Sequence, residues 1–129
     1  MAAKDKKYIV DSSFVLAFFL PSEKSKQVDE IFTQYKDGKI KLISSYLLPF
    51  EVGNGLKTAV IRKRLGAKEA KILISAFLDL GIELEEINTE ETFKLALVKN
   101  LTMYAAAYLF LAKAKHLPLL TLDPDLKKY

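Results

Sequence analysis

The chain has 129 residues, of which 50% are hydrophobic and 28% are charged, so it can form one compact domain with its own core. This composition excludes a disordered or low-complexity chain. The absence of cysteine and the single histidine exclude disulfide frameworks, zinc–thiolate sites and thiol catalysis, and leave a Ser-His-Asp centre hard to build. Lysine and arginine number 20 against 16 acids, and this net charge of +4 is compatible with a polyanionic partner without proving one. Carboxylates and a hard metal ion are therefore the expected agents of any chemistry.

The N-terminal segment carries lysines followed by an apolar run, as a signal peptide does. Asp11, Ser12 and Ser13 interrupt that run. The longest uninterrupted apolar stretch, residues 14–20, is far shorter than the roughly 20 residues that span a bilayer. We therefore expect a soluble cytoplasmic protein with no membrane segment.

Short apolar runs alternate along the chain with stretches in which apolar residues recur at helical spacing. Strands that alternate with helices imply right-handed crossovers and a parallel sheet covered on both faces. The expected fold is a single three-layer α/β/α domain over residues 1–129, with a mainly parallel central sheet. In chain order we predict a strand over 8–10, helices over 14–20 and 22–36, a strand over 40–43, helices from near 47 to 64 and over 67–80, a half-exposed strand over 82–87, helices over 89–99 and 103–115, and a last strand over 119–122.

Several polar residues are placed to start or end these helices. Ser12 or Ser13 is expected to cap the first helix, and Thr102 the helix over 103–115. His116, at the other end of that helix, is expected to cap its carbonyl groups rather than act as a base.

Three acids fall where parallel sheets bind their ligands, beyond the carboxyl ends of strands. Asp11 directly follows the first predicted strand, Asp123 directly follows the last, and Glu51 lies in the early turns of the helix after the second strand. Each acid has an ordinary alternative, because Asp11 can cap a helix, Glu51 can be solvated and Asp123 before Pro124 can form a turn. Their joint placement nevertheless favours a site.

Several carboxylates in one crevice raise one another's pKa unless a cation neutralises them. Mg²⁺ or Mn²⁺, held by Asp11, Glu51, Asp123 and waters, is the economical solution. Such an ion polarises a phosphate and activates a water for in-line attack.

The sequence contains, in this order, the segments YIVDSS (8–13), LPFEV (48–52), LTMYAAAYL (101–109) and TLD (121–123). In order and spacing they resemble the PIN domain, and more narrowly the VapC-type ribonuclease toxins of prokaryotic toxin–antitoxin pairs. The resemblance covers nearly the whole chain and implies a Mg²⁺- or Mn²⁺-dependent endoribonuclease with four acids. It assigns Asp11, Glu51 and Asp123 as the first, second and fourth acid, and Ser13 and Thr121 as the accompanying hydroxyl residues.

The third acid of the family pattern is missing, because Ala105 stands where the resemblance implies an aspartate after the tyrosine. With Thr102 as N-cap, residue 105 is the third helical position, where a carboxylate is also favoured by backbone N–H groups and the positive helix end. The alanine is either engineered, to disarm a toxic nuclease, or natural, in a degenerate member that kept the scaffold. In both cases we expect weak metal binding and poor cleavage.

Two other classes compete with the nuclease. One is a catalytically degenerate PIN-like module that binds RNA or protein. The other is a phosphoacceptor receiver-like domain, which also gathers acids at strand ends but has a lysine where TLD stands here. A second departure from the family is that its members usually continue past the fourth acid with another strand. This sequence ends at Tyr129, which fits either a trimmed C-terminus or a shortened sheet edge.

The densest basic segment surrounds Gly66 and includes Arg62, Lys63 and Arg64. These side chains either steer RNA phosphates toward the acids or form a solvated helix surface. Tyr104 and Tyr108 lie one helical turn apart, so they share a face that either stacks on bases or, as we expect, packs in the core.

The resemblance also implies an RNA substrate, a homodimer and a small antitoxin whose C-terminal segment covers the acids. The first helix carries more apolar surface than a short helix needs, with Phe14, Val15, Phe18 and Phe19. This surface is either a groove for a partner helix or dimer, or ordinary core.

Overall fold

The computed structural model describes residues 6–23 and 25–129. Four parallel strands form one sheet in the order β3-β2-β1-β4, so the prediction of a parallel sheet is confirmed. From β1 the chain continues to β2 and β3 on one side of β1, and it later crosses to β4 on the other side. The strand order therefore reverses between β1 and β4, and parallel sheets bind their ligands at such a reversal. The strands are β1 Lys6–Val10, β2 Ile40–Ser45, β3 Glu83–Glu85 and β4 Leu119–Leu120.

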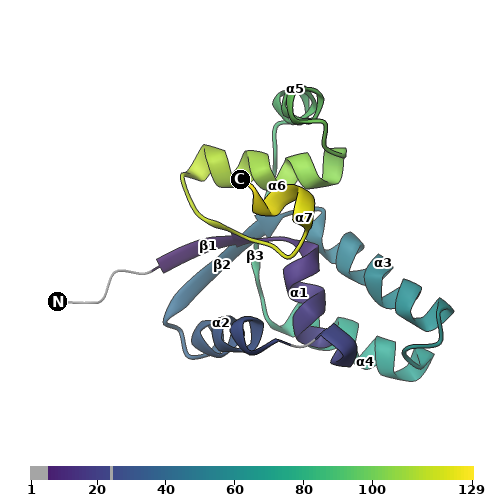
Figure 1. Cartoon of the computed structure of the whole chain (residues 1–129). Helices are drawn as coiled ribbons and strands as arrows, with labels where there is room; N and C mark the ends of the chain where they lie inside the picture. Colours follow the sequence, from purple (N-terminus) through teal and green to yellow (C-terminus); the bar gives the residue numbers. More distant parts are fainter. Residues whose placement is uncertain (1–5, 24) are drawn as a thin grey trace.

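Helices cover both faces of this sheet, with α2 and α4 on one side and α6 and α7 on the other, while α5 packs on the outer side of α6 (Figure 1). The helical segments are α1 Ser12–Phe19, the short 3₁₀ helix η1 Pro21–Glu23, α2 Lys26–Lys36, α3 Leu48–Ile61, α4 Ala67–Asp79, α5 Thr89–Lys99, α6 Met103–Lys115 and α7 Pro124–Lys127.

Side chains of β1 alternate between two apolar cores, as the period-2 geometry of a strand requires. Val10 is fully buried in the larger core, together with residues of α1, α2 and α3. Ile9 points to the opposite face, where it packs with Ile43, Leu111 and Ala112 beneath α6. The expected three-layer α/β/α architecture is therefore confirmed.

Two helix boundaries differ from the prediction by three residues or more, because other capping bonds form. The predicted helix over 22–36 begins only at Lys26, since the side chain of Ser25 accepts a hydrogen bond from Val28 N and the preceding residues form η1. α3 ends at Ile61 rather than 64. Lys63 there adopts a left-handed conformation (φ 60°), and Arg64 N donates to the carbonyl of Ala59.

The helix over 103–115 has the predicted bounds, and Thr102 caps it by accepting from Ala105 N at 3.1 Å. His116 ends it in a left-handed conformation, donating its backbone N–H to the carbonyls of Ala112 and Lys113. The capping predictions for both ends of α6 are therefore confirmed. The apolar residues of the first helix are core, because Phe14, Val15 and Phe19 are buried and Phe18 stacks on Phe32.

Within the described residues, no single helix is long and apolar enough to cross a membrane. The pair α5 and α6 meets the length and composition criteria only when joined, and it is bent by 108°.

Candidate active site

Asp11 follows β1 and caps α1, which is the ordinary role that the sequence allowed for this acid. Ser12 and Ser13, the other predicted caps, do not cap the helix. Its Oδ1 accepts from Phe14 N at 3.0 Å and from Ser13 Oγ at 2.7 Å, and its Oδ2 accepts from the hydroxyl of Thr121. The side chain is only 2% exposed. Asp11 takes the cap because it has an extended backbone (φ −103°, ψ 179°) directly before the first helical residue, whereas Ser12 and Ser13 already lie within the helix.

Ser13 and Thr121 join the end of β4 to the start of α1. Ser13 Oγ accepts from Leu122 N at 2.9 Å, and Thr121 Oγ1 accepts from Asp123 N at 2.9 Å. These backbone N–H groups bond to side chains and not to β1, so the strand stops at Leu120, two residues before the predicted end. The same bonds place Asp123 beside Asp11.

Asp123 caps α7, a short helix that the sequence suggested only as a turn at Pro124. The Oδ1 atom of Asp123 accepts from Asp125 N at 2.9 Å. Its charge raises the pKa of both Asp11 and Glu51, so the three acids lie close enough for electrostatic interaction.

Glu51 reaches the site from the first turn of α3. Its Oε1 accepts from the hydroxyl of the buried Tyr108 at 2.6 Å and from Ser12 Oγ at 3.3 Å. Among the residues that the structure describes, nothing donates to Oε2. One oxygen of this carboxylate is thus held by two hydroxyl groups while the other stays available to a ligand.

The fold makes ionisation of these acids unfavourable. Burial raises the pKa of the Asp11 carboxyl, against the lowering effect of Thr121, Ser13 and Phe14 N, and the charge of Asp123 raises it further. Burial also raises the pKa of Glu51 above its usual value, and the charges of Asp11 and Asp123 add to this effect. Burial and the neighbouring Glu51 raise the pKa of the Tyr108 hydroxyl, so it stays protonated and donates.

The donor chemistry of this cluster fits a hard divalent cation. Within residues 6–23 and 25–129, no lysine or arginine forms an ion pair with Asp11, Glu51 or Asp123. Over the same residues, no three acidic or histidine side chains gather tightly enough to hold one ion together. Mg²⁺ needs only one or two carboxylates and keeps several waters, so the cluster suits such an ion with a small number of protein ligands.

The position of Ala105 on α6 can be judged from its spacing to Tyr108. It is three residues before Tyr108, whose hydroxyl contacts Glu51, and helical residues three apart are neighbours on one face. Because helical side chains lean toward the N-terminus, the Tyr108 side chain runs over the turn that holds Ala105. A longer side chain at position 105 would therefore extend toward the same cluster.

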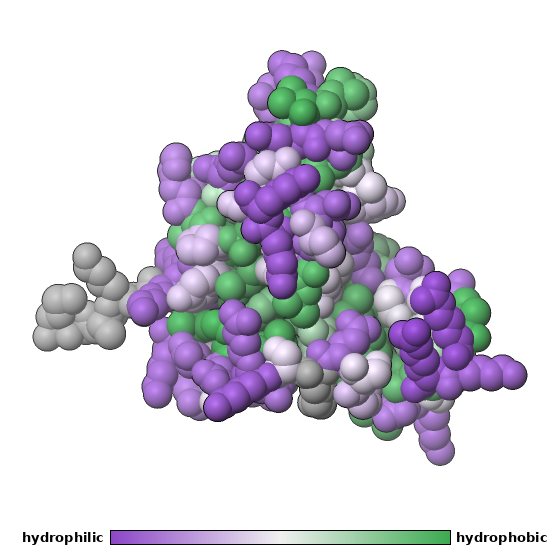
Figure 2. All heavy atoms as spheres, viewed as in Figure 1, coloured by the Kyte–Doolittle hydropathy of each residue, from purple (hydrophilic) through white to green (hydrophobic). Residues whose placement is uncertain are grey.

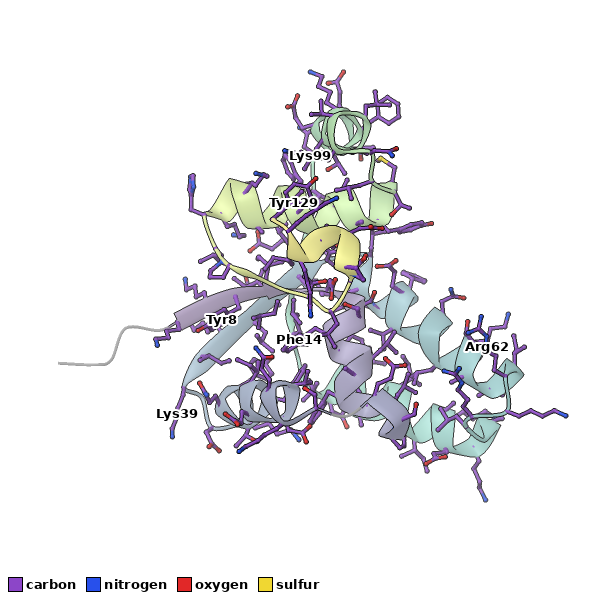
Figure 3. The ribbon with its side chains drawn as sticks, in the orientation of Figure 1. Tyr8, Phe14, Lys39, Arg62, Lys99 and Tyr129 are labelled. Carbon is purple, nitrogen blue, oxygen red and sulfur yellow. The ribbon has the colours of Figure 1, made fainter. Side chains whose placement is uncertain are left out.

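The predicted RNA-binding residues lie outside this cluster. Arg62, Lys63 and Arg64 are exposed at the junction of α3 and α4, and Figure 3 shows Arg62 at the far end of α3. The helical rise puts Arg62 roughly 16 Å along the α3 axis from Glu51. They are thus not part of the acid cluster, and contact with RNA remains a prediction.

Sequence reasoning missed the contacts that Ser12 and Tyr108 make with Glu51. Tyr108 is buried, as predicted, but its hydroxyl also orients a candidate ligand, whereas Tyr104 is exposed and not core. Ser44, at the end of β2, was also missed; it donates to the carbonyl of Val10 at 2.6 Å and so braces the strand that carries Asp11. The only signal for Tyr108 was its position one turn after Ala105.

Three comparisons agree with this geometry. A model of the PIN domain matches residues 8–129. Ribonuclease VapC3 of Pyrobaculum aerophilum is 32% identical over 124 residues, covering 93% of this chain and 92% of the relative.

Two solved structures share the fold. The first is the crystal structure of PAE2754 from Pyrobaculum aerophilum, with a TM-score of 0.73 and 24% identity over 97% of this chain and 85% of that one. The second is VapC20 of Mycobacterium tuberculosis, a sarcin-ricin loop cleaving toxin, with a TM-score of 0.67 and 15% identity over 94% of this chain and 93% of that one. The chain therefore belongs to the PIN domain family and, within it, to the VapC type.

Proposed function

We propose that this chain is a metal-dependent endoribonuclease of the VapC toxin type, weakened or inactive as written because position 105 is alanine. The observation that carries this proposal is the convergence of Asp11, Glu51 and Asp123 at the carboxyl edge of the sheet, without a lysine or arginine to neutralise them among the described residues. The relative VapC3 carries the name ribonuclease, which supports RNA as the substrate class.

Asp11, Glu51 and Asp123 are the candidate ligands for Mg²⁺ or Mn²⁺, with one or two of them binding the ion directly and waters completing its shell. A bound ion of this kind supplies Lewis-acid polarisation of a phosphodiester and a more acidic water. Ser13 and Thr121 fix the orientation of Asp11, and Ser12 and Tyr108 fix that of Glu51. The hydroxyl groups thus keep both carboxylates in place before any ligand arrives, which lowers the cost of binding it.

Membership of the VapC type supports two protein partners, a second copy of the chain and a small antitoxin, and both stand as proposals. An RNA substrate and an antitoxin would place the protein in the cytoplasm. Arg62, Lys63 and Arg64 would contact RNA phosphates well away from the scissile bond, and such contacts weaken as salt rises.

The test restores the missing acid. Ala105→Asp should cut RNA in Mg²⁺ or Mn²⁺ far faster than the chain as written, because it adds a carboxylate on the α6 face that carries Tyr108. EDTA should stop the reaction, and Asp11→Asn in the restored chain should abolish it. Ala114→Asp is the matched control, because Ala114 is exposed near the other end of the same helix α6 and should leave the activity unchanged.

The alternative is a degenerate PIN-like module that binds RNA or protein without cutting, and Ala105 itself is the observation in its favour. A folded Ala105→Asp protein that is inert on varied RNAs in both metals would support this module and refute the nuclease.

A further inference from the structure

A cavity of about 430 Å³ lies between the turn that joins β2 to α3 and the helices α5 and α6. This volume is within the range of about 300–1,000 Å³ that small-molecule sites occupy. Two tyrosines that line it are largely exposed, Tyr46 by 54% and Tyr104 by 55%. The other lining residues used below are Leu47, Thr92, Met103 and Ala107.

Residues that line the cavity are close neighbours along the chain of residues at the acid cluster. Leu47, in its lining, accepts the backbone hydrogen bond of Glu51 N at 3.0 Å. Tyr104 directly precedes Ala105, and Ala107 directly precedes Tyr108, whose hydroxyl contacts Glu51. A ligand in this cavity would therefore lie against the first turns of α3 and α6, which carry Glu51 and the position of the missing acid.

Among the described residues, one buried polar atom of the lining has no hydrogen-bond partner. Thr92 is 1% exposed, and its Oγ1 has no hydrogen-bond partner within the described part of the chain. Such a buried hydroxyl is unfavourable in the free protein, because it has given up water without gaining another bond. A ligand with a polar edge would remove that penalty, whereas a purely apolar one would not.

Exposed apolar side chains also occur elsewhere on the surface, but there they are not combined with a buried hydroxyl that needs a partner. On α5, for example, Phe93, Leu97 and Val98 are exposed, and Figure 2 shows hydrophobic atoms at the top of the view, where α5 lies. The residues of that patch are all apolar, so it has no polar atom in need of a partner. The cavity combines aromatic rings, a buried hydroxyl with no partner among the described residues, and a lining drawn from the first turn of α6 and the turn before α3.

We propose that this cavity binds a nucleobase of the RNA next to the phosphate at the acid cluster. A nucleobase has flat faces that stack on tyrosine rings and polar edges that pair with a hydroxyl. Tyr46 and Tyr104 supply the stacking surface, Thr92 the hydrogen bond and Met103 an apolar wall. The choice of RNA rests on the proposed function, but binding of a base in this cavity does not require cleavage.

The experiment follows backbone amide signals of the ¹⁵N-labelled chain during titration with each of the four ribonucleoside monophosphates, in EDTA so that no cleavage occurs. We expect at least one nucleotide to give saturable shifts at Thr92 and Ala107. Tyr104→Ala should weaken this binding about 5- to 100-fold through lost stacking, and Tyr104→Phe should retain it. Thr92→Val, which keeps the shape, should weaken binding about fivefold without lowering the melting temperature. Tyr129→Ala removes an exposed tyrosine that does not line the cavity and should change nothing.

Absence of saturable shifts at millimolar nucleotide, or shifts that persist in Tyr104→Ala and Thr92→Val, would overturn the proposal. It would also be overturned if Tyr104→Ala altered only the association state in light scattering, since the cavity would then be a protein contact. The two proposals fail separately. Cleavage by Ala105→Asp without nucleotide binding refutes only the base site, and cavity-dependent binding without any cleavage refutes only the nuclease.

Discussion

Replacing Asp11 with asparagine should make the metal-free protein more stable while removing the first candidate metal ligand. The asparagine carbonyl can accept the bonds that Ser13 Oγ and Phe14 N now give to Oδ1, so the cap of α1 is kept. Its amide group can donate to Thr121 Oγ1, which reverses the present bond. The substitution therefore removes the buried charge and leaves the shape and the connections of the side chain nearly unchanged.

The size of the gain follows from the cost of ionising Asp11 in the fold. Its pKa is raised above 3.8 even though three hydrogen bonds oppose the shift, so burial and the charge of Asp123 outweigh those bonds. Each unit of that rise corresponds to about 1.4 kcal/mol of lost stability at neutral pH. Stabilising substitutions at functional sites typically gain about 0.5–2 kcal/mol. We expect a gain of about 1–2 kcal/mol, or roughly 3–8 °C in melting temperature for a chain of this length.

The sign of the pH dependence gives a second readout. The pKa of Asp11 is higher in the folded state than in the unfolded state. The protonated acid therefore contributes fully to the stability below pH 3.8, and this contribution is lost as the pH rises through the pKa of the folded state. Thermal unfolding without metal should therefore show the difference between Asp11→Asn and the parent chain at pH 7, shrinking as the pH is lowered. Asp79→Asn, which removes an exposed charge at the end of α4, serves as the control and should change the stability by less than about 0.5 kcal/mol. A lower melting temperature for Asp11→Asn at pH 7 would refute this reasoning, since the charged hydrogen bonds would then outweigh the cost of burial.

Two further substitutions test the packing around the site. Tyr108→Phe removes the hydroxyl that lowers the pKa of Glu51. In the Ala105→Asp chain, the acid limb of the pH–rate profile should therefore move to higher pH. The lost hydrogen bond should also reduce the stability by about 1–2 kcal/mol. Gly55→Ala should destabilise the fold by about 1–2 kcal/mol in urea unfolding, because the new Cβ would lie 2.4 Å from Leu16 Cδ1 and overpacking outweighs the better helix propensity.

The outcomes that would contradict these two predictions are also specific. An unchanged acid limb in Tyr108→Phe would show that Glu51 does not titrate in the observed step. Gly53→Ala is the matched control for Gly55→Ala, because its Cβ would meet only Ile74 Cδ1 at 3.9 Å, and it should stabilise α3 by about 0.5–1 kcal/mol. Equal effects at the two glycines would refute the close approach of α1 to α3.

The secondary structure was largely predictable because it depends on near neighbours. The cap at Thr102 and the helix over 103–115 follow from residues within one or two turns, and both were predicted correctly. The errors arose where distant groups compete for the same backbone. The last strand ends early because Leu122 N bonds to Ser13, a residue 109 positions away in the sequence. No local pattern carries that information.

The sequence by itself determined that the chain folds as a parallel α/β domain and that Asp11, Glu51 and Asp123 follow its strands, because hydrophobic periodicity and strand ends are local properties. Only the tertiary structure decided which groups surround these acids. The bond from Tyr108 to Glu51 spans 57 residues, and the burial of the Thr92 hydroxyl is apparent only once α5 has packed against its neighbours. The physical reason is that strand order and helix packing bring these groups together, and pKa values and unpaired polar atoms depend on that three-dimensional environment.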